Sequence, residues 1–423
     1  MDYLPRIVDS ELDELLGHLP ALAIEGAKAI GKTESARRRA GTVHRLDDPN
    51  QRQILGADPS RLTNGAAPIL IDEWQRLPLS WDVVRRAVDD DQSAARFLLT
   101  GSAAPLEAPT HSGAGRIVTV RMRPLSLAER RPGMGTLSLG ELLRGRRPEL
   151  TGASRLTLTD YADEIVRSGF PAIRTFNGRA LRAQLDGYLD RIVERDFAEL
   201  GQRVRNPAML RRWLAAFGAA SSTTASFEVI RDASSAGDRE KPARSTTQPY
   251  RAVLERLWMI DEVPAWLPSR NRLRRLATAP VRQLADPALV ARLLGVDADA
   301  LLEAAPAGPP MPRDGPLLGV LFEALVTLSV RVAAQASEAR VSHLRTVSGD
   351  HEVDLIVERP DGRVVAIEVK LSQTVDDADL RHLRWLADRI GDDLLDAIVV
   401  TTGTEAYRRP DGIGVVPAAL LMP

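Results

Sequence analysis

One short motif restricts the folds open to this chain more than any other feature. Residues 26–33 spell Gly-Ala-Lys-Ala-Ile-Gly-Lys-Thr, the pattern of a loop whose main-chain N–H groups wrap phosphate oxygens. An apolar run, 22–24, precedes the loop and a helix-forming run, 34–39, follows it. This strand-loop-helix setting favours a phosphate-binding loop over the alternative, a glycine-rich turn without a ligand. The predicted nucleotide-binding residues are Gly26, Ala27, Lys28, Ala29, Ile30, Gly31, Lys32 and Thr33.

A pair of carboxylates follows at the distance that such a loop requires. The apolar run 69–71 has the length of a buried strand and ends in Asp72 and Glu73. We expect Asp72 to share the shell of Mg²⁺ with Thr33, and Glu73 to polarise the water that attacks the γ phosphate. The alternative is a strand followed by a charged turn. Paired with the loop, the motif predicts an ATPase whose cofactors are ATP and Mg²⁺, although the preference for ATP over GTP stays open.

The N-terminal part has the pattern of an α/β domain. Short apolar runs alternate with helical stretches, and the predicted strands are 21–25, 42–46, 68–71 and 96–100. Trp81 to Val88 predicts a helix between the last two strands. The last strand ends in hydroxyls, where Thr100 or Ser102 is placed to sense the γ phosphate. Capping of a turn explains these hydroxyls equally well.

An arginine follows a flexible segment in the same domain. Residues 112–115 are Ser-Gly-Ala-Gly, and Arg116 comes next. We prefer Arg116 as the arginine finger that stabilises transition-state charge, acting in cis or from a neighbouring subunit. Arg121 and Arg123 are the next candidates, and a solvated arginine is the commoner case.

The residue pattern changes twice in the rest of the chain. This is expected because 423 residues are too many for a single domain with one hydrophobic core. After Pro124 the pattern is helical, with helices expected at 161–168 and 180–200, and then at 209–217, 226–233 and 248–258 in a winged-helix spacing. A Pro/Ala/Gly stretch, 304–312, predicts a linker or surface loop. Beyond it we expect a helix at 317–336, strands at 353–357, 364–369 and 396–400, and a helix at 380–390.

The last of these segments carries a second set of carboxylates. Asp354 lies in one predicted strand, Glu368 and Lys370 lie in the next, and alternate strand residues share a side. This looks like the PD-(D/E)xK nuclease pattern, in which Asp354, Glu368 and Glu323 would bind Mg²⁺ and Lys370 would position water. A plain ion pair on an exposed strand face is the alternative, and a nuclease-like fold need not cleave.

These patterns predict a fold class and its domains. The fold is α/β, with the P-loop NTPase domain at 1–130, a helical lid at 131–204, a winged-helix-like domain at 205–285 and a nuclease-like α/β domain at 286–423.

The charge balance limits how the chain meets nucleic acid. Its composition, 44% hydrophobic and 27% charged, is that of a folded protein, and the net charge is −1. No global field draws it to DNA, so binding requires a local patch. Arginines cluster around the third winged-helix element, with Trp258 and Trp266 among them, although a solvated face is an equal alternative. The predicted phosphate contacts are Arg270, Arg272, Arg274 and Arg275.

Other features bear on location. The chain has no cysteine, which excludes disulfides and thiol chemistry. Residues 1–10 mix charges with apolar residues, unlike a signal peptide, and no uncharged apolar stretch reaches the ~18 residues of a membrane helix. We therefore expect a cytoplasmic protein with no membrane contact.

Several of these stretches together resemble a known family. The chain is similar to prokaryotic AAA-like ATPases that carry a C-terminal domain of unknown function 4143. The resemblance implies an AAA-type ATPase with a winged helix and a nuclease-like C-terminal fold. One departure is the longer polar segment at 234–245, where relatives have a tight helix-turn-helix. The matching stretches are 3–6, the P-loop with Lys28, 72–75, 99–102, 111–116, 123–129, 169–171, 195–196 and 321–323.

The predicted function is ATP hydrolysis on or near nucleic acid. The alternatives are an ATP-gated, Mg²⁺-dependent nuclease and a slow nucleotide switch that controls a partner protein. The expected partners are a nucleotide, DNA, a protein and, as in AAA-type proteins, further copies of the chain.

Overall fold

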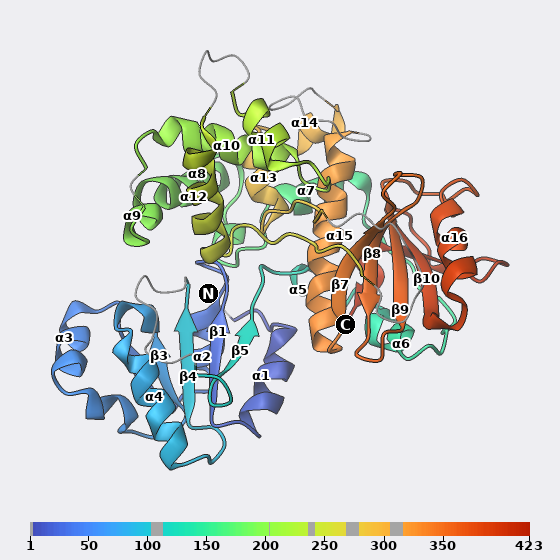
Figure 1. Ribbon diagram of the computed structural model, residues 1–423. Helices are drawn as coiled ribbons and strands as arrows, with labels where there is room; N and C mark the ends of the chain where they lie inside the picture. Colours follow the sequence, from blue (N-terminus) through green and yellow to red (C-terminus); the bar gives the residue numbers. More distant parts are fainter. Residues whose placement is uncertain (1–2, 103–112, 203, 236–241, 268–278, 305–315) are drawn as a thin grey trace.

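The computed structural model describes residues 3–102, 113–202, 204–235, 242–267, 279–304 and 316–423. A parallel sheet with its helices forms the N-terminal part, helices form the middle, and a second sheet lies on the other side of a long helix (Figure 1).

The N-terminal sheet has five strands in the order β2-β3-β4-β1-β5, and all neighbours run parallel. Its strands are β1 (Ala21–Glu25), β2 (Thr42–Arg45), β3 (Ile69–Asp72), β4 (Phe97–Gly101) and β5 (Val118–Arg121). The four predicted strands are confirmed to within a residue at each end. We did not predict β5, because its residues are mostly exposed and form no continuous apolar run.

Helices accompany this sheet and follow the expected amphipathic pattern. They are α1 (Val8–Leu16), α2 (Lys32–Arg37), α3 (Pro49–Ala57) and α4 (Leu79–Asp90). In α4, Val84 and Val88 are buried, as their i, i+4 spacing predicts. Parallel strands place all their carboxyl ends at one edge of the sheet, so the segments that follow β1, β3 and β4 meet there.

The middle of the chain is helical. Its helices are α5 (Leu127–Arg130), α6 (Leu139–Leu143), α7 (Leu158–Val166), α8 (Gly178–Arg191), α9 (Phe197–Glu199), α10 (Pro207–Ala219), α11 (Phe227–Ala233), α12 (Arg244–Arg256), α13 (Pro287–Leu293) and α14 (Ala298–Leu302). Helices predicted at 161–168, 209–217, 226–233 and 248–258 correspond to α7, α10, α11 and α12. The single helix predicted at 180–200 is interrupted, because a π-helical turn, Ile192–Asp196, separates α8 from α9.

Two antiparallel bridges follow the three helices α10, α11 and α12. Ile260 pairs with Leu284, and Val263 pairs with Val281, on either side of residues 268–278. Those eleven residues contain Arg270, Arg272, Arg274 and Arg275, and they lie outside the described residues. So do residues 305–312 of the predicted linker, and 236–241 of the polar segment, whose end forms the start of α12.

The C-terminal sheet has the order β11-β12-β10-β9-β8-β7, antiparallel from β7 to β9 and parallel from β9 through β10 to β12. The predicted elements are confirmed as α15 (Leu317–Ala336), β8 (Glu352–Glu358), β9 (Val364–Lys370), α16 (Arg381–Ile390) and β10 (Leu394–Thr401). Three strands of this sheet escaped prediction, β7 (Arg340–Arg345), β11 (Tyr407–Arg408) and β12 (Gly414–Pro417). A short strand, β13 (Leu421–Met422), pairs outside this sheet with β6 (Leu137–Ser138).

Helix α15 lies at the centre of the molecule (Figure 1). It packs against α1, α5, α6, α7 and α13, and against β7 and β9. By length and composition it is apolar enough to cross a membrane, but 83% of its apolar window is buried inside the protein. The helix therefore fits the role of a shared core element, which explains its apolar character.

A largely, though not fully, buried charge network joins the three parts. Asp261, which follows α12, receives Arg123 Nε at 2.9 Å on one carboxylate oxygen and Arg331 Nη2 of α15 at 2.9 Å on the other. Arg121 of β5 lies 3.8 Å from the same carboxylate. Burial raises the pKa of Asp261, but the three arginines together lower it well below its usual range.

Candidate functional site

The P-loop joins β1 to α2 at the carboxyl edge of the sheet. Gly26 has φ +154°, and a Cβ there would lie 2.2 Å from the carbonyl oxygen of Met122. Gly31 has φ +100°, a conformation that side chains rarely adopt. Both glycines are therefore required by the shape of the loop, as the motif predicts.

Lys32 begins α2 and is 5% exposed. Its Nζ donates to the carbonyl oxygens of Gly26 at 2.9 Å and Ala27 at 2.7 Å. Burial lowers the pKa of Lys32 to about 8, although the charges of Glu73 and Asp72 act in the opposite direction. The ammonium group thus lies inside the loop, beside the two carboxylates at the end of β3.

The predicted magnesium ligands are brought together. The Thr33 hydroxyl donates to Asp72 Oδ1 at 2.8 Å, and the Thr100 hydroxyl of β4 contacts the same oxygen. Asp72 is 6% exposed and Thr100 is fully buried. Thr100 therefore lies against the carboxylate at the end of the neighbouring strand. A hydroxyl and a carboxylate are the hard oxygen ligands that Mg²⁺ prefers, so this donor set fits the ion.

Glu73 is held in an unusual backbone conformation, with φ 58° and ψ 44°. Gln75 Nε2 donates to Glu73 Oε2 at 2.7 Å, and the Ser102 hydroxyl lies 3.3 Å from the same oxygen. Strained non-glycine positions persist where the surrounding structure holds them in place. Sequence reasoning named Ser102 as a γ-phosphate sensor but assigned no role to Gln75, whose only signal was its place in the family stretch 72–75.

The arginines separate to opposite edges of the sheet. Arg116 precedes β5 and pairs with Asp89 at the end of α4, with Nε and Oδ1 2.7 Å apart. That is the amino edge of β5, away from the P-loop of the same chain. Arg121 ends β5 opposite Glu25 in the register. Its side chain is 18% exposed, and its guanidinium lies 3.6 Å from the centre of the Trp258 ring. A role for Arg116 in trans stays a prediction.

An N-terminal arginine braces the loop, which the motif alone did not predict. Arg6 donates to the Ile30 carbonyl at 2.8 Å, to Glu129 Oε1 at 3.0 Å and to the Arg123 carbonyl at 2.7 Å. Its family stretch, 3–6, was the only signal in the sequence. Beside Gly31 lies an open cavity of about 630 Å³. It is lined by Tyr3, Leu4, Arg6, Ile30, Gly31, Glu34, Ser35, Arg37, Arg38, Met122 and Pro171.

The four predicted nuclease residues share a second cavity, of about 660 Å³. Glu323 comes from α15, Asp354 from β8, and Glu368 with Lys370 from β9. Lys370 Nζ lies 2.9 Å from Glu368 Oε1, and the Val369 N–H donates to Asp354 Oδ2 at 2.7 Å. The turn between α10 and α11, from Ser222 to Ala225, forms another wall.

These carboxylates perturb one another. Burial raises the pKa of Asp354 to about 6, and burial with the charge of Asp354 raises the pKa of both Glu323 and Glu368. Among the described residues, however, no three His, Asp or Glu side chains converge as ligands of one ion. The carboxylates are thus neighbours in one cavity without forming a ready metal centre.

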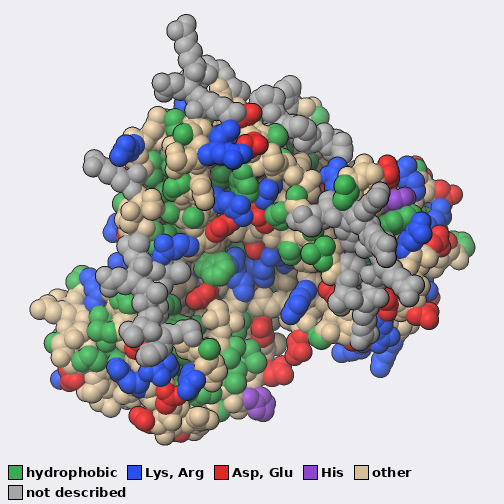
Figure 2. Space-filling model, in the orientation of Figure 1, with side chains coloured by type: hydrophobic (Ala, Val, Ile, Leu, Met, Phe, Trp, Pro, Cys, Tyr) green, Lys and Arg blue, Asp and Glu red, His purple; other side chains and the backbone are tan. Residues whose placement is uncertain are grey.

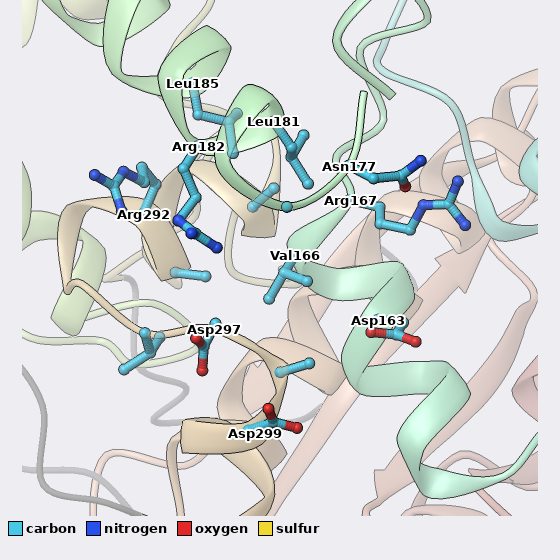
Figure 3. A pocket seen from close by; sticks show the side chains of 15 residues that line it. Asp163, Val166, Arg167, Asn177, Leu181, Arg182, Leu185, Arg292, Asp297 and Asp299 are labelled. Carbon is cyan, nitrogen blue, oxygen red and sulfur yellow. The ribbon is translucent and has the colours of Figure 1, made fainter. Parts of the chain in front are cut away.

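A third pocket, of about 360 Å³, contains none of the predicted site residues (Figure 3). Leu181 and Leu185 of α8 line it together with Arg182, while Asp297 and Asp299 lie on the other side. Its Arg292 is already held by Asp186, with Nε and Oδ1 2.6 Å apart. In the view of Figure 2, basic and acidic side chains gather in the hollow between the β1–β5 domain and the helices.

The match of the N-terminal part to the AAA domain family supports an ATPase-type nucleotide-binding function. Residues 18–130 match the AAA domain family, residues 158–300 match domain of unknown function 8612, and residues 318–421 match domain of unknown function 4143. The predicted resemblance is confirmed by two of these matches, the one to the AAA domain and the one to domain of unknown function 4143.

The curated relatives name no activity. Uncharacterised proteins of Mycobacterium bovis and Mycobacterium tuberculosis are each 26% identical over 377 residues, which cover 87% of this chain and 74% of each relative. A solved structure of the Aeropyrum pernix ORC2 protein, in ADPNP-ADP complexes, is 14% identical and covers 77% of this chain and 97% of its own, with a TM-score of 0.28.

Proposed function

We propose that this protein binds ATP with Mg²⁺ and hydrolyses it. The observation that carries the proposal is the convergence of Thr33 with Asp72 and Glu73 beside a P-loop in which Gly26 leaves no room for a side chain. Bound Mg²⁺, held by Thr33 and Asp72, would neutralise charge on the phosphates.

The protein's own residues bind the phosphates and activate the attacking water. The loop N–H groups and Lys32 orient the phosphates, for which Lys32 must exchange the carbonyls of Gly26 and Ala27 for phosphate oxygens. Glu73 accepts the proton of the attacking water, and Gln75 with Ser102 holds its carboxylate in place. Thr100 keeps Asp72 oriented toward Thr33.

The cavity beside Gly31 is the proposed place of the nucleoside. It adjoins the loop, and the Tyr3 ring, Met122 and Pro171 offer apolar surface for a base. Arg6 connects this cavity to the loop through Ile30, so base binding and loop position are linked.

A binding titration tests the proposal. Calorimetry should detect MgATP binding by the wild type and none by Lys32→Ala, because the ammonium group contacts phosphate in the ground state. Lys370→Ala, which removes a lysine from the other cavity, is the control and should bind normally. Equal binding by Lys32→Ala would remove the P-loop from the site.

The same proposal includes a role on nucleic acid, a winged helix and the four domains with their predicted bounds. It also includes an oligomeric form and a cytoplasmic location. Three helices followed by two antiparallel bridges support a winged helix at 205–285. ATPase stimulation by DNA would favour action on nucleic acid, whereas an unstimulated slow rate would favour the nucleotide switch that controls a partner protein.

A second candidate is an ATP-gated nuclease. One observation favours it: Glu323, Asp354, Glu368 and Lys370 line a single cavity. These oxygen ligands suit Mg²⁺, and a cation would stabilise the carboxylates, whose pKa values are raised first by burial and then by mutual repulsion. Mg²⁺-dependent loss of DNA or RNA by the wild type but not by Asp354→Ala tests it. Asp361→Ala, in the exposed turn after β8, is the matched control.

A further inference from the structure

An ion pair crosses from the P-loop to the helical region. Lys28, the third residue of the loop, places Nζ 2.6 Å from Asp196 Oδ1 and 3.4 Å from Glu199 Oε2. The Tyr188 hydroxyl of α8 also donates to the Lys28 carbonyl at 3.3 Å. The loop expected to wrap the phosphates is therefore tied, through one residue, to the end of α8 and the turn that follows it.

The two ends of this pair differ in their surroundings. The Asp196 side chain is 2% exposed, whereas that of Lys28 is 29% exposed. Asp196 ends the π-helical turn Ile192–Asp196, an insertion of the kind often found at functional sites. Burial raises the pKa of Glu199, but Lys28 and Arg195 lower it overall. Lys28 thus forms ion pairs with two carboxylates, one of which is buried.

Lys28 is also close to the phosphate-binding groups. It is among the charges that lower the pKa of Lys32, so the two ammonium groups act on each other across the loop. The Lys28 ammonium group can bind either the carboxylate pair or a phosphate, since charge-assisted hydrogen bonds to either are of similar strength. A triphosphate carries an additional phosphoryl group and more negative charge than a diphosphate.

We propose that Lys28 is a second phosphate-binding lysine that favours nucleoside triphosphate over diphosphate, and that it leaves Asp196 to make this contact. This inference rests on the proposed function. Asp196, buried and deprived of its ammonium partner, then costs free energy until the helical turn moves or takes up water. Triphosphate binding is therefore coupled to the helical region, and the coupling acts equally in both directions.

Two substitutions at the pair test this directly, with calorimetric titration of a non-hydrolysable ATP analogue and of ADP, both with Mg²⁺. Asp196→Asn removes the competing charge and should tighten analogue binding by about tenfold with little change for ADP. Lys28→Met should weaken analogue binding by about tenfold more than ADP binding, as expected for one charge-assisted contact. In the double variant, Asp196→Asn should have no further effect. Glu199→Gln, at the exposed carboxylate, is the control and should change little.

Amide exchange supplies a measurement that does not depend on affinity. Addition of the analogue to the wild type should speed exchange at residues 192–199, and Lys28→Met should abolish that response. Equal loss of ATP-analogue and ADP affinity in Lys28→Met, or unchanged or weaker analogue binding by Asp196→Asn, would show that the pair is only structural. Slower amide exchange at 192–199 on addition of the analogue would equally contradict the proposal that Lys28 leaves Asp196 for the phosphate. Absence of any nucleotide binding by the wild type would instead refute the proposed function itself.

Discussion

Replacement of Asp261 by Asn should destabilise the whole protein, because this carboxylate holds arginines from β5, the segment after it and α15. Arg123 and Arg331 each bond one of its oxygens at 2.9 Å, and the side chains of both are 13% exposed. The Asn side chain keeps the shape but leaves these guanidinium groups without a buried counter-charge.

The expected cost is roughly 3–5 kcal/mol, the range for removal of one partner from a buried ion pair. A loss of this size lowers the melting temperature of a large domain by about 10 °C. Thermal unfolding followed by far-ultraviolet circular dichroism measures it. Asp58→Asn is the control, because the Asp58 and Arg61 side chains are 50% and 61% exposed, and exposed pairs contribute little.

Acid titration adds a second test. Because the folded-state pKa of Asp261 is depressed, its contribution to stability is present above the unfolded pKa of about 3.9 and is lost as pH falls below that value. Asp261→Asn should therefore lose less stability than the wild type on acidification. A melting temperature of Asp261→Asn within about 2 °C of the wild type would refute the idea that this network joins the three parts.

Three further predictions concern the nucleotide and nucleic-acid sites. Since burial lowers the pKa of Lys32 to about 8, MgATP affinity should fall as pH rises through that value; a flat calorimetric profile between about 7 and 9 would contradict it. If Arg116 acts across a subunit interface, Arg116→Ala and Lys32→Ala should each be inactive and their mixture should recover ATPase activity, whereas normal hydrolysis by Arg116→Ala would shift the role to Arg121 or Arg123. Replacement of Arg272, Arg274 and Arg275 by Ala should weaken DNA binding to all sequences and flatten its salt dependence, and an unchanged salt slope in a filter-binding titration would remove these residues from the interface.

The sequence predicted the elements whose patterns are dictated locally. The buried strands β1, β3 and β4 appear as continuous apolar runs, and the P-loop carries its own spacing. Helix α15 was found in full because most of its residues are apolar. Edge and short strands such as β5, β7 and β11 were missed, because their partly exposed residues lack a strong period.

Local sequence patterns could not predict contacts between segments that are distant in the sequence. Nothing near Lys28 indicates Asp196, 168 positions later, and nothing near Arg123 indicates Asp261. The π-helical turn that breaks the predicted helix at 180–200 has no sequence signature of its own, and it is the feature that ends in Asp196. The nuclease-like residues were predicted as a set, Glu323 from a helix and the other three from two strands. The wall formed by Ser222 to Ala225 depends instead on packing between the middle and C-terminal parts.

If Glu73 activates water at a P-loop that binds ATP, its loss should slow hydrolysis without weakening binding. MgATP affinity and steady-state hydrolysis should be compared for the wild type and Glu73→Gln. We expect unchanged affinity, within about threefold, and a fall in turnover of about a hundredfold or more, as expected when a general base is lost. Hydrolysis at the wild-type rate by a Glu73→Gln protein that binds MgATP normally would show that Glu73 does not activate the water.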